Sequence, residues 1–476
     1  DPPPSTEGPS ATAPRLRVHW VHRFHRDGFM AALKRMRRGG GALRRGGGVV
    51  ARQAGGEAAR PLWEPWEAPG SLQGGSANFE WAEAEALDRV KYTPKDVFLA
   101  GMRHHHIANT AYPIGHLTTL KPYRVRRVRE QEEILQTLQG SYSGLEEMML
   151  YAHVPFCHQR CQFCEYTVVD PKRGGRDEDI HRRYFEALEG ELSLYEKALG
   201  LRGKKIVGFD IGGGTPSFVD AEHITRLVGR IGDMVHLPSD VEISIETTPK
   251  IAAAEPEKIK AYYDAGIRRI SMGLQTTDFR MAKELGRNDE GFVDRAVQNI
   301  RDAGFESFNI DLMYGFPVRK GTVDKWPDTV TSTMALEPDH ITLYRMRYKG
   351  TRMSHLQDRV LLDQVNAQGE LAAFLLESQG YAGWVGKNTY SKTPHDSGCS
   401  DYLHRRVVEA VPYVGLGLGA QSFSHHSLTY NLGGVTKKLG QYVSSVALGR
   451  LPTQDVYHLS RSAAMGKMAS VSFYFG

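Results

Sequence analysis

The chain has 476 residues, of which 41% are apolar and 24% charged, as is ordinary for a globular protein of one large domain with extensions. It contains no run of about 18 apolar residues, so we expect no membrane span. Four cysteines in so long a chain do not form a disulfide framework, and free thiols require a reducing compartment.

The positive net charge of +5 is concentrated at the N-terminus. Residues 1–60 contain 12 Lys and Arg against 4 Asp and Glu, which leaves the remainder close to neutral. We therefore expect no nucleic-acid surface on the body of the protein. Residues 1–85 are rich in Pro, Arg and Gly, which predicts a poorly structured leader. This leader is either an organelle transit peptide, for a plastid or mitochondrion, or, on a cytoplasmic protein, a disordered tail or a translated non-coding stretch.

From about residue 145 onward, apolar β-rich segments alternate with segments of helical periodicity. Residues 178–199 and 291–304 place apolar side chains at spacings of three and four, which predicts helices. Six strand–helix units in series indicate a parallel sheet with right-handed crossovers. Because eight units close a full barrel, six indicate an open, partial one of the α/β class. We predict strands at 148–154, 205–211, 241–247, 268–274, 307–314 and 339–346.

Three of the four cysteines follow the first predicted strand, which contains Tyr151. Cys157, Cys161 and Cys164 have the spacing Cys-x3-Cys-x2-Cys, and Phe163 lies between the last two. A four-iron cluster is usually held by four cysteine thiolates. Three thiolates would leave the fourth iron open to a cofactor, and Phe163 could shield the cluster. Active sites of such folds lie at the C-terminal ends of the strands, where this loop stands.

A structural zinc site is the alternative for the same cysteines. His153 or His158 would then be the fourth ligand. Zinc modules usually place a second ligand pair a dozen or more residues further on, and only the distant Cys399 follows here. The spacing therefore favours the iron cluster. The tract His104–His106 could bind a metal, but no residues nearby in the sequence would complete such a site, so we interpret it as a loop.

Glycines and polar residues stand at the ends of the following strands. Glycines let the backbone approach a ligand, while carboxylates and amides suit an amino group and ribose hydroxyls. An arginine could pair with a carboxylate in a bidentate way. Each residue alone is as consistent with a turn, a cap or a core position, so the prediction rests on their joint placement. The set comprises Gly213, Gly214, Thr215, Glu246, Gln275, Arg287 and Asp311.

Two further groups of residues have mainly structural interpretations. We expect Trp326, Tyr344 and Trp384 to pack in the interior rather than to stack on a ligand. The alternating glycines of 415–419 predict a strand or turn that lies close to a ligand or to another backbone.

Together these motifs resemble the radical S-adenosylmethionine (SAM) superfamily, and within it the family of oxygen-independent coproporphyrinogen III oxidases and haem chaperones. The resemblance extends over about 105–470, and Thr110 to Pro113 are similar to a motif upstream of the cluster. The motifs that carry it lie at 151–164, 212–216, 244–246, 271–275, 311–317 and 415–420.

The resemblance implies a partial (β/α)6 barrel with a [4Fe-4S] cluster and SAM as cofactors. A reduced flavodoxin- or ferredoxin-type donor would supply an electron, SAM would be cleaved, and the resulting radical would abstract hydrogen from a tetrapyrrole or other small-molecule substrate. The cluster ligands would be Cys157, Cys161 and Cys164. The catalytic residues would be Tyr151, Glu246 and Gln275. The cofactor contacts would be Tyr151, Phe163, Gly213, Gly214, Thr215, Glu246, Gln275, Arg287 and Asp311.

Two segments depart from the family pattern. Oxidases carry a fourth cysteine where this chain has Tyr166, and residues 399–404 replace a His-Asn-x-x-Tyr-Trp element. Three functions therefore stay open, namely oxidative decarboxylation of coproporphyrinogen III, haem carriage, and methyl transfer to an aromatic substrate. We expect a leader at 1–85, an N-terminal extension at 86–144, the barrel at 145–380 and a truncated substrate or lid region at 381–476.

Overall fold

The computed structural model describes most of the chain from residue 130 onward. The leader, most of the N-terminal extension, the Thr110–Pro113 motif and the tract His104–His106 lie outside the described residues. No helix within the described ranges has the length and apolar character that crossing a membrane requires. The described ranges are 130–169, 176–317, 323–348, 351–384, 388–433, 438–459, 461 and 464–465.

One twelve-stranded sheet runs through these residues, in the order β12-β11-β10-β9-β1-β2-β3-β4-β5-β6-β8-β7. The pairings from β1 to β6 are all parallel, which confirms the predicted α/β class and parallel sheet. Every predicted strand is present within two residues of its predicted bounds. The six strands are β1 Glu147–Val154, β2 Lys205–Gly213, β3 Ile243–Thr247, β4 Ile267–Gln275, β5 Ser307–Tyr314 and β6 His340–Arg345.

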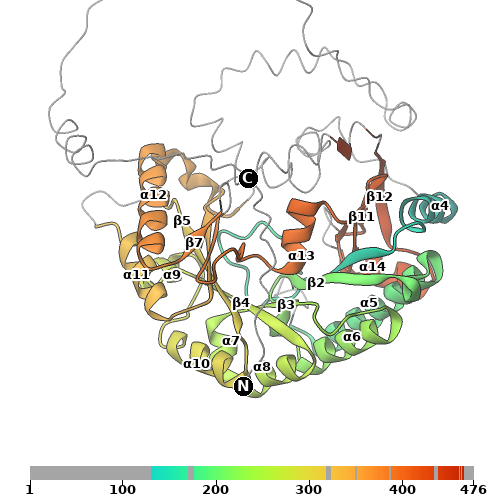
Figure 1. Cartoon of the computed structure of the whole chain (residues 1–476), viewed down its shortest axis with the longest axis horizontal. Coiled ribbons are helices and arrows are strands. Elements are labelled where there is room, and N and C mark those ends of the chain that lie inside the picture. The colour runs from blue at the N-terminus through green and yellow to red at the C-terminus, as the bar shows by residue number, and fades with distance from the viewer. Residues whose placement is uncertain are drawn as a thin grey trace, which may run out of the picture. The chain divides into compact units, whose positions relative to one another are not determined.

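Helices cover the convex face of the curved sheet (Figure 1). Helix α5 spans Glu178–Leu199, as predicted, and Gly200 ends it in a left-handed conformation (φ 63°). Helix α10 spans Val293–Ala303, and Gly304 (φ 105°) ends it in the same way. The other helices along this face are α6 Ala221–Met234, α7 Pro249–Ala254, α8 Pro256–Asp264, α9 Phe279–Glu284, α11 Trp326–Ala335 and α12 Leu362–Ser378.

The hydrophobic core lies between this face and the helices. In β3, Ile243 and Ile245 are buried in the core, whereas Glu246 is exposed towards the other face. This alternation follows from the two-residue period of a strand. The concave face is polar along several strands and includes Asp210, Ser271 and Asp311. The sheet therefore presents polar side chains to its hollow side.

Additional strands extend both edges of the sheet, which the sequence patterns did not predict. Strand β9 (Tyr413–Leu416) pairs in parallel with β1, and its glycine run confirms the expected close approach of backbones. A Cβ on Gly417 would lie 2.7 Å from the carbonyl oxygen of His153. The other added elements are β7 Ala382–Gly383, β8 Thr389–Ser391, α13 Asp401–His404, β10 Gln421–Phe423, β11 Ser427–Asn431, α14 Leu439–Ala447 and β12 Thr453–His458, with α4 Gln131–Tyr142 beside β11 and β12.

A buried carboxylate joins this C-terminal extension to α5. Glu191 is fully buried and accepts hydrogen bonds from the backbone N–H of Gly417 (2.7 Å), from Asn431 Nδ2 (2.6 Å) and from Tyr442 Oη (2.6 Å). The three donors come from the loop after β9, from β11 and from α14. One side chain of α5 therefore stabilises three segments that are far apart in the sequence.

We predict that Glu191→Gln lowers the free energy of unfolding by about 1–3 kcal/mol, because its NH2 group would face donors and leave a buried group unsatisfied. Burial raises the pKa of Glu191 to about 8, so urea unfolding at pH 9, where the carboxylate is ionised, measures this change. The matched control is Glu186→Gln, on the same helix, which removes an exposed pair with Arg182 and should change stability by less than about 1 kcal/mol. Equal stability of the two variants would contradict the role of Glu191.

Candidate active site

A cavity of about 530 Å3 lies at the C-terminal ends of the parallel strands. Its volume is within the range of small-molecule sites. It is lined by residues of the cysteine loop and by residues that follow each of the next strands. All but one of the predicted site residues line it, namely Cys157, Cys161, Cys164, Phe163, Gly213, Gly214, Thr215, Glu246, Gln275, Arg287 and Asp311.

The remaining predicted residue, Tyr151, lies in β1 next to residues of the cavity but does not line it. A Cβ on Gly212 would lie 3.2 Å from its hydroxyl and 2.9 Å from Glu246 Oε1, so all three groups meet at one point. Burial raises the pKa of Tyr151 well above its usual value, and Glu246 adds to this effect. The phenol is therefore neutral at physiological pH and can donate a hydrogen bond.

The cysteine loop is fixed against the turn after β2 by backbone hydrogen bonds. Gly214 N–H donates to Val154 C=O (2.8 Å), and Thr215 N–H donates to Phe156 C=O (2.8 Å). A Cβ on Gly214 would lie 2.9 Å from Cys157 Sγ, so only glycine lets the turn approach the loop this closely. The glycine at this position is therefore required by the packing of the loop.

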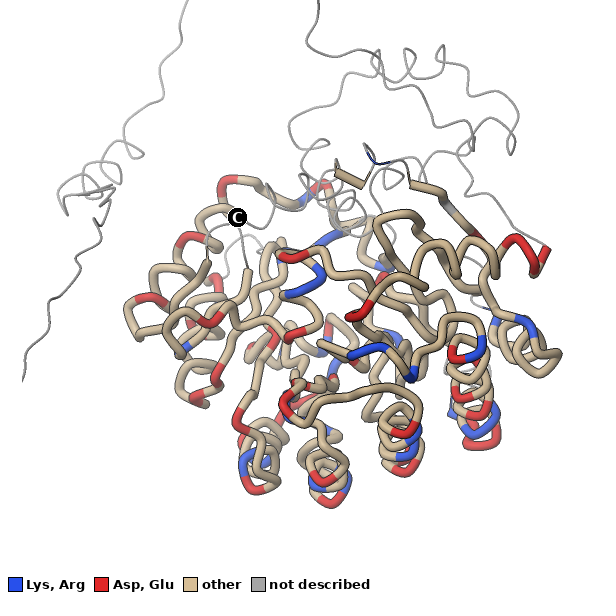
Figure 2. Tube along the Cα trace, turned by 45° about the vertical axis from the view of Figure 1, so that its right-hand side comes forward, with Lys and Arg blue, Asp and Glu red and all other residues tan. Residues whose placement is uncertain are grey.

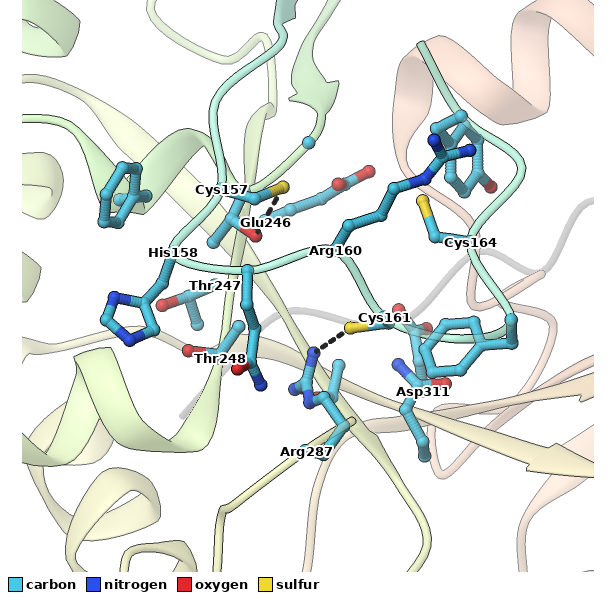
Figure 3. A pocket seen from close by; sticks show the side chains of 18 of the residues that line it. Cys157, His158, Arg160, Cys161, Cys164, Glu246, Thr247, Thr248, Arg287 and Asp311 are labelled. Atoms are coloured by element: carbon cyan, nitrogen blue, oxygen red, sulfur yellow. Dashed lines mark hydrogen bonds between the residues drawn. The ribbon is translucent and has the colours of Figure 1, made fainter. Parts of the chain in front are cut away.

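The three loop cysteines form no disulfide, and the polar neighbours of Cys157 and Cys161 are as follows. Thr215 Oγ1 donates to Cys157 Sγ (3.6 Å), and Arg287 Nη1 donates to Cys161 Sγ (3.9 Å; Figure 3). Burial raises the pKa of the Cys157 thiol to about 12, against the effect of Thr215. A thiol with so high a pKa loses its proton when a metal binds it, so metal binding here releases protons.

The loop does not suit a single zinc ion. No set of three or more His, Cys, Asp and Glu converges on one ion position in the part of the chain that the structure describes. His153 uses both ring nitrogens, with Thr167 C=O (2.7 Å) and Tyr151 Oη (3.3 Å). His158 points away from Cys161 and Cys164, and its ring lies 6.1 Å from that of Phe218 (Figure 3).

A four-iron cluster places different demands on the same thiols. Each thiolate binds a different iron, so the sulfurs must surround a volume rather than meet at a point. Cys157, Cys161 and Cys164 do so around one side of the cavity (Figure 3). The donor set of this loop therefore fits a cluster and argues against the zinc alternative.

Carboxyl groups gather on the hollow side of the sheet, and their pKa values are raised. Desolvation by the surrounding protein, together with the nearby Asp311 and Asp210, raises the pKa of Glu246 to about 8. Burial raises the pKa of Asp311 to about 6. Asp311 is oriented by Asn309 Nδ2 (2.7 Å) and Ser271 Oγ (3.2 Å). Glu246 is exposed to the cavity and Asp311 is half-buried, so a polar ligand can reach both carboxyl groups.

Gln275 and Arg287 complete the far side of the cavity. Gln275 ends β4 with a positive φ of 72°, a conformation that is uncommon outside glycine and recurs at functional sites. Arg287 is paired with Asp289 (2.9 Å) and also donates to Gly273 C=O. Arg287 therefore pairs with a carboxylate, as expected, but the pair is a single contact with the side chain of Asp289 and is not bidentate.

The interior positions predicted for the aromatic residues need two corrections. Trp326 is buried and stacks on Tyr314 (5.3 Å), as expected. Tyr344 was expected in the interior but lines the cavity with 38% of its surface exposed, because it lies on the inward-facing side near the end of β6. Trp384 has the same exposed fraction and meets the ring of His404 edge-on (5.7 Å). Tyr344 is therefore a candidate site residue.

Sequence patterns also missed several charged residues of the cavity. Arg160 and Glu165 belong to the cysteine loop, whereas Arg345 and Arg347 lie at and after the end of β6. The sequence signals that could have identified these residues are their positions next to the cysteines and at the end of a predicted strand. Cys399, which was expected to stand apart, does not line this cavity.

Comparisons with known proteins agree with this geometry. The family model described as the radical SAM superfamily matches residues 151–322, which begin within β1 and include the cysteine loop and β2 to β5. A solved structure described as coproporphyrinogen III oxidase (HemN) from Escherichia coli, a radical SAM enzyme, superposes with a TM-score of 0.61. The match covers 73% of this chain and 79% of that one at 24% identity, which shows the fold alone.

Relatives of two kinds are similar in sequence. The heme chaperone HemW of Haemophilus influenzae is 29% identical over 62% of this chain and 73% of its own length. The oxygen-independent coproporphyrinogen III oxidase of Helicobacter pylori is 26% identical over 71% of this chain and 74% of its own length. The oxygen-independent coproporphyrinogen III oxidase of Escherichia coli is 30% identical over 63% of this chain and 65% of its own length. In sequence and fold the chain is thus similar to the radical SAM superfamily and, within it, to oxygen-independent coproporphyrinogen III oxidases and heme chaperones.

Proposed function

We propose that this protein is a tetrapyrrole enzyme that uses a [4Fe-4S] cluster and SAM, with oxidative decarboxylation of the propionates of coproporphyrinogen III as its reaction. Similarity to this family implies both cofactors, and the spacing of Cys157, Cys161 and Cys164 is consistent with them. The observation that carries the proposal is the single cavity in which these thiols meet the glycine turn and the polar strand ends.

The loop thiols would hold the cluster on one wall of the cavity. When bound, the cluster supplies the electron that cleaves SAM, and a reduced flavodoxin- or ferredoxin-type protein would replenish it. Phe163 packs against a buried group that includes Leu285 and Met353, and this packing would keep water from the loop. The protein's contribution is to position and enclose the cofactors.

The opposite wall would bind SAM. Backbone N–H and C=O groups at Gly213–Thr215 can be approached closely because the glycines lack side chains. Glu246 and Asp311 would accept hydrogen bonds from amino and hydroxyl groups, and Gln275 would both donate and accept. Arg287, held by Asp289, would keep the loop at Cys161 in place. Tyr151 would position Glu246.

Haem carriage is the second candidate function. Tyr166 stands where oxidases of the family carry a fourth cysteine, and it lines the cavity with 46% of its surface exposed. A heme chaperone is among the relatives of similar identity. In this alternative the cluster and SAM would support binding rather than turnover.

Product analysis separates the two functions. The protein is reconstituted anaerobically with iron and sulfide and then incubated with reductant, SAM and coproporphyrinogen III. We expect deoxyadenosine and protoporphyrinogen IX by mass spectrometry. Stoichiometric haem binding with no change in the porphyrin would instead support the carrier, and the absence of any cluster would contradict both.

We predict that Cys161→Ala loses the cluster and deoxyadenosine formation, because the loop would then offer only two thiolates. Iron and sulfide content and deoxyadenosine yield measure the effect. Cys399→Ala, which lies outside the cavity lining, is the matched control and should retain both. Retained cleavage in Cys161→Ala would refute the ligand assignment, and loss of iron in Cys399→Ala would reveal a missed ligand.

We predict that the affinity for S-adenosylhomocysteine rises about tenfold between pH 7 and pH 9. The pKa of Glu246 is raised to about 8, so its carboxyl is mostly protonated at pH 7 and ionised at pH 9, where it accepts hydrogen bonds more strongly. Calorimetric titration at each pH measures the change. Glu246→Gln should flatten the profile, and the exposed Glu257→Gln should preserve it. An unchanged profile in Glu246→Gln would contradict the assignment.

A further inference from the structure

The cations that line the cavity differ in how they are neutralised. Arg287 forms an ion pair with Asp289, and Arg347 forms one with Glu165. Arg160 lines the same cavity, but no described carboxylate lies within ion-pair distance of it. Its Nε atom is buried and has no hydrogen-bond partner. Arg160 is thus a cation of the cavity that the described protein leaves unneutralised.

The position of Arg160 is set by the cysteine loop itself. Its neighbour Cys161 is a proposed cluster ligand, and its backbone carbonyl accepts a hydrogen bond from Arg352 Nη1 (3.4 Å). The next peptide is also fixed, because Gln162 N–H donates to Leu285 C=O (2.9 Å). From this anchored backbone the side chain extends across the cavity towards Cys164 (Figure 3).

An unsatisfied N–H of a guanidinium is costly when it is shielded from water. Burying a donor without a partner costs about 1–3 kcal/mol, and more for a charged group. A bound anion removes this cost and gains a charge-assisted bond, and the planar guanidinium fork matches a carboxylate in a bidentate way. The unpartnered state of Arg160 therefore favours an anionic ligand in the cavity.

Neighbouring carboxylates are engaged elsewhere. Glu165 is paired with Arg347, and Asp311 is oriented by Asn309 and Ser271. Lys and Arg are interspersed with Asp and Glu along the helices of the described chain, so neither sign of charge dominates there (Figure 2). The anion that pairs with Arg160 therefore has to come from outside the described protein.

We infer that Arg160 binds a carboxylate of the substrate and so determines which part of the substrate faces the cluster. The inference rests on the proposed function, since the propionates of a tetrapyrrole supply such carboxylates. The cluster with its thiolates and the carboxylate of SAM are the other anions within the cavity, and the test below separates them.

The test compares binding of coproporphyrin III with that of its tetramethyl ester, which has the same ring but no carboxylates. The probes are titrated into wild-type protein, Arg160→Met, Arg160→Lys and the exposed control Arg295→Met on α10, and Soret absorbance is followed. We expect Arg160→Met to bind the acid about 10- to 100-fold more weakly, with unchanged affinity for the ester. Arg160→Lys should recover part of the affinity, and Arg295→Met should match the wild type.

Three results would overturn the inference in distinguishable ways. If the wild type binds neither porphyrin, the proposed tetrapyrrole function fails and the inference fails with it. If the wild type prefers the acid and Arg160→Met shows the same preference, only the inference fails. If Arg160→Met keeps its porphyrin affinity but loses iron or weakens S-adenosylhomocysteine binding, the anion is the cluster or the SAM carboxylate.

Discussion

Two backbone hydrogen bonds hold the glycine turn after β2 against the start of the cysteine loop, and the rest of the site depends on them. They join Gly214 to Val154 and Thr215 to Phe156. They continue the parallel register of β1 and β2, in which Val154 lies beside Gly213. Since the register also aligns β3 to β5, the polar ends of these strands face the same cavity as the thiols.

The electrostatic character of the cavity follows from this arrangement. Side chains that alternate inward along parallel strands bring Glu246, Asp311 and Asp210 close together on the hollow side of the sheet. Burial and mutual repulsion favour their neutral forms, so the unliganded cavity holds less negative charge than its composition suggests. The unneutralised Arg160 stands on the cysteine side. The cavity thus presents hydrogen-bonding carboxyls on one wall and a cation on the other.

Much of this could be predicted from the sequence because the signals were local. Strand β5 was predicted with its observed bounds, and the helix from Glu178 to Leu199 likewise, since hydrophobic periodicity and the glycine that follows define them. The placement of Glu246, Gln275 and Asp311 around one cavity followed from the rule that the C-terminal ends of parallel strands share an edge.

The features that were missed depend on contacts between distant segments. Glu191 lies on a helix whose pattern shows only its amphipathic face, and its three donors are more than 200 residues away. The edge strands β7 to β12 are short, and their pairing partners cannot be read from periodicity. Tyr344 resembled a core residue because aromatic side chains usually pack inside, and only the curvature of the sheet shows that it faces the cavity.

The central claim is that Cys157, Cys161 and Cys164 hold a four-iron cluster with one iron open to SAM. Electron paramagnetic resonance of the reconstituted, reduced protein, recorded before and after SAM is added, tests it most directly. The account predicts a reduced-cluster signal whose g-values shift on addition of SAM, because the open iron gains ligands. A signal that SAM leaves unchanged, or a protein that binds one zinc and no iron, would contradict it.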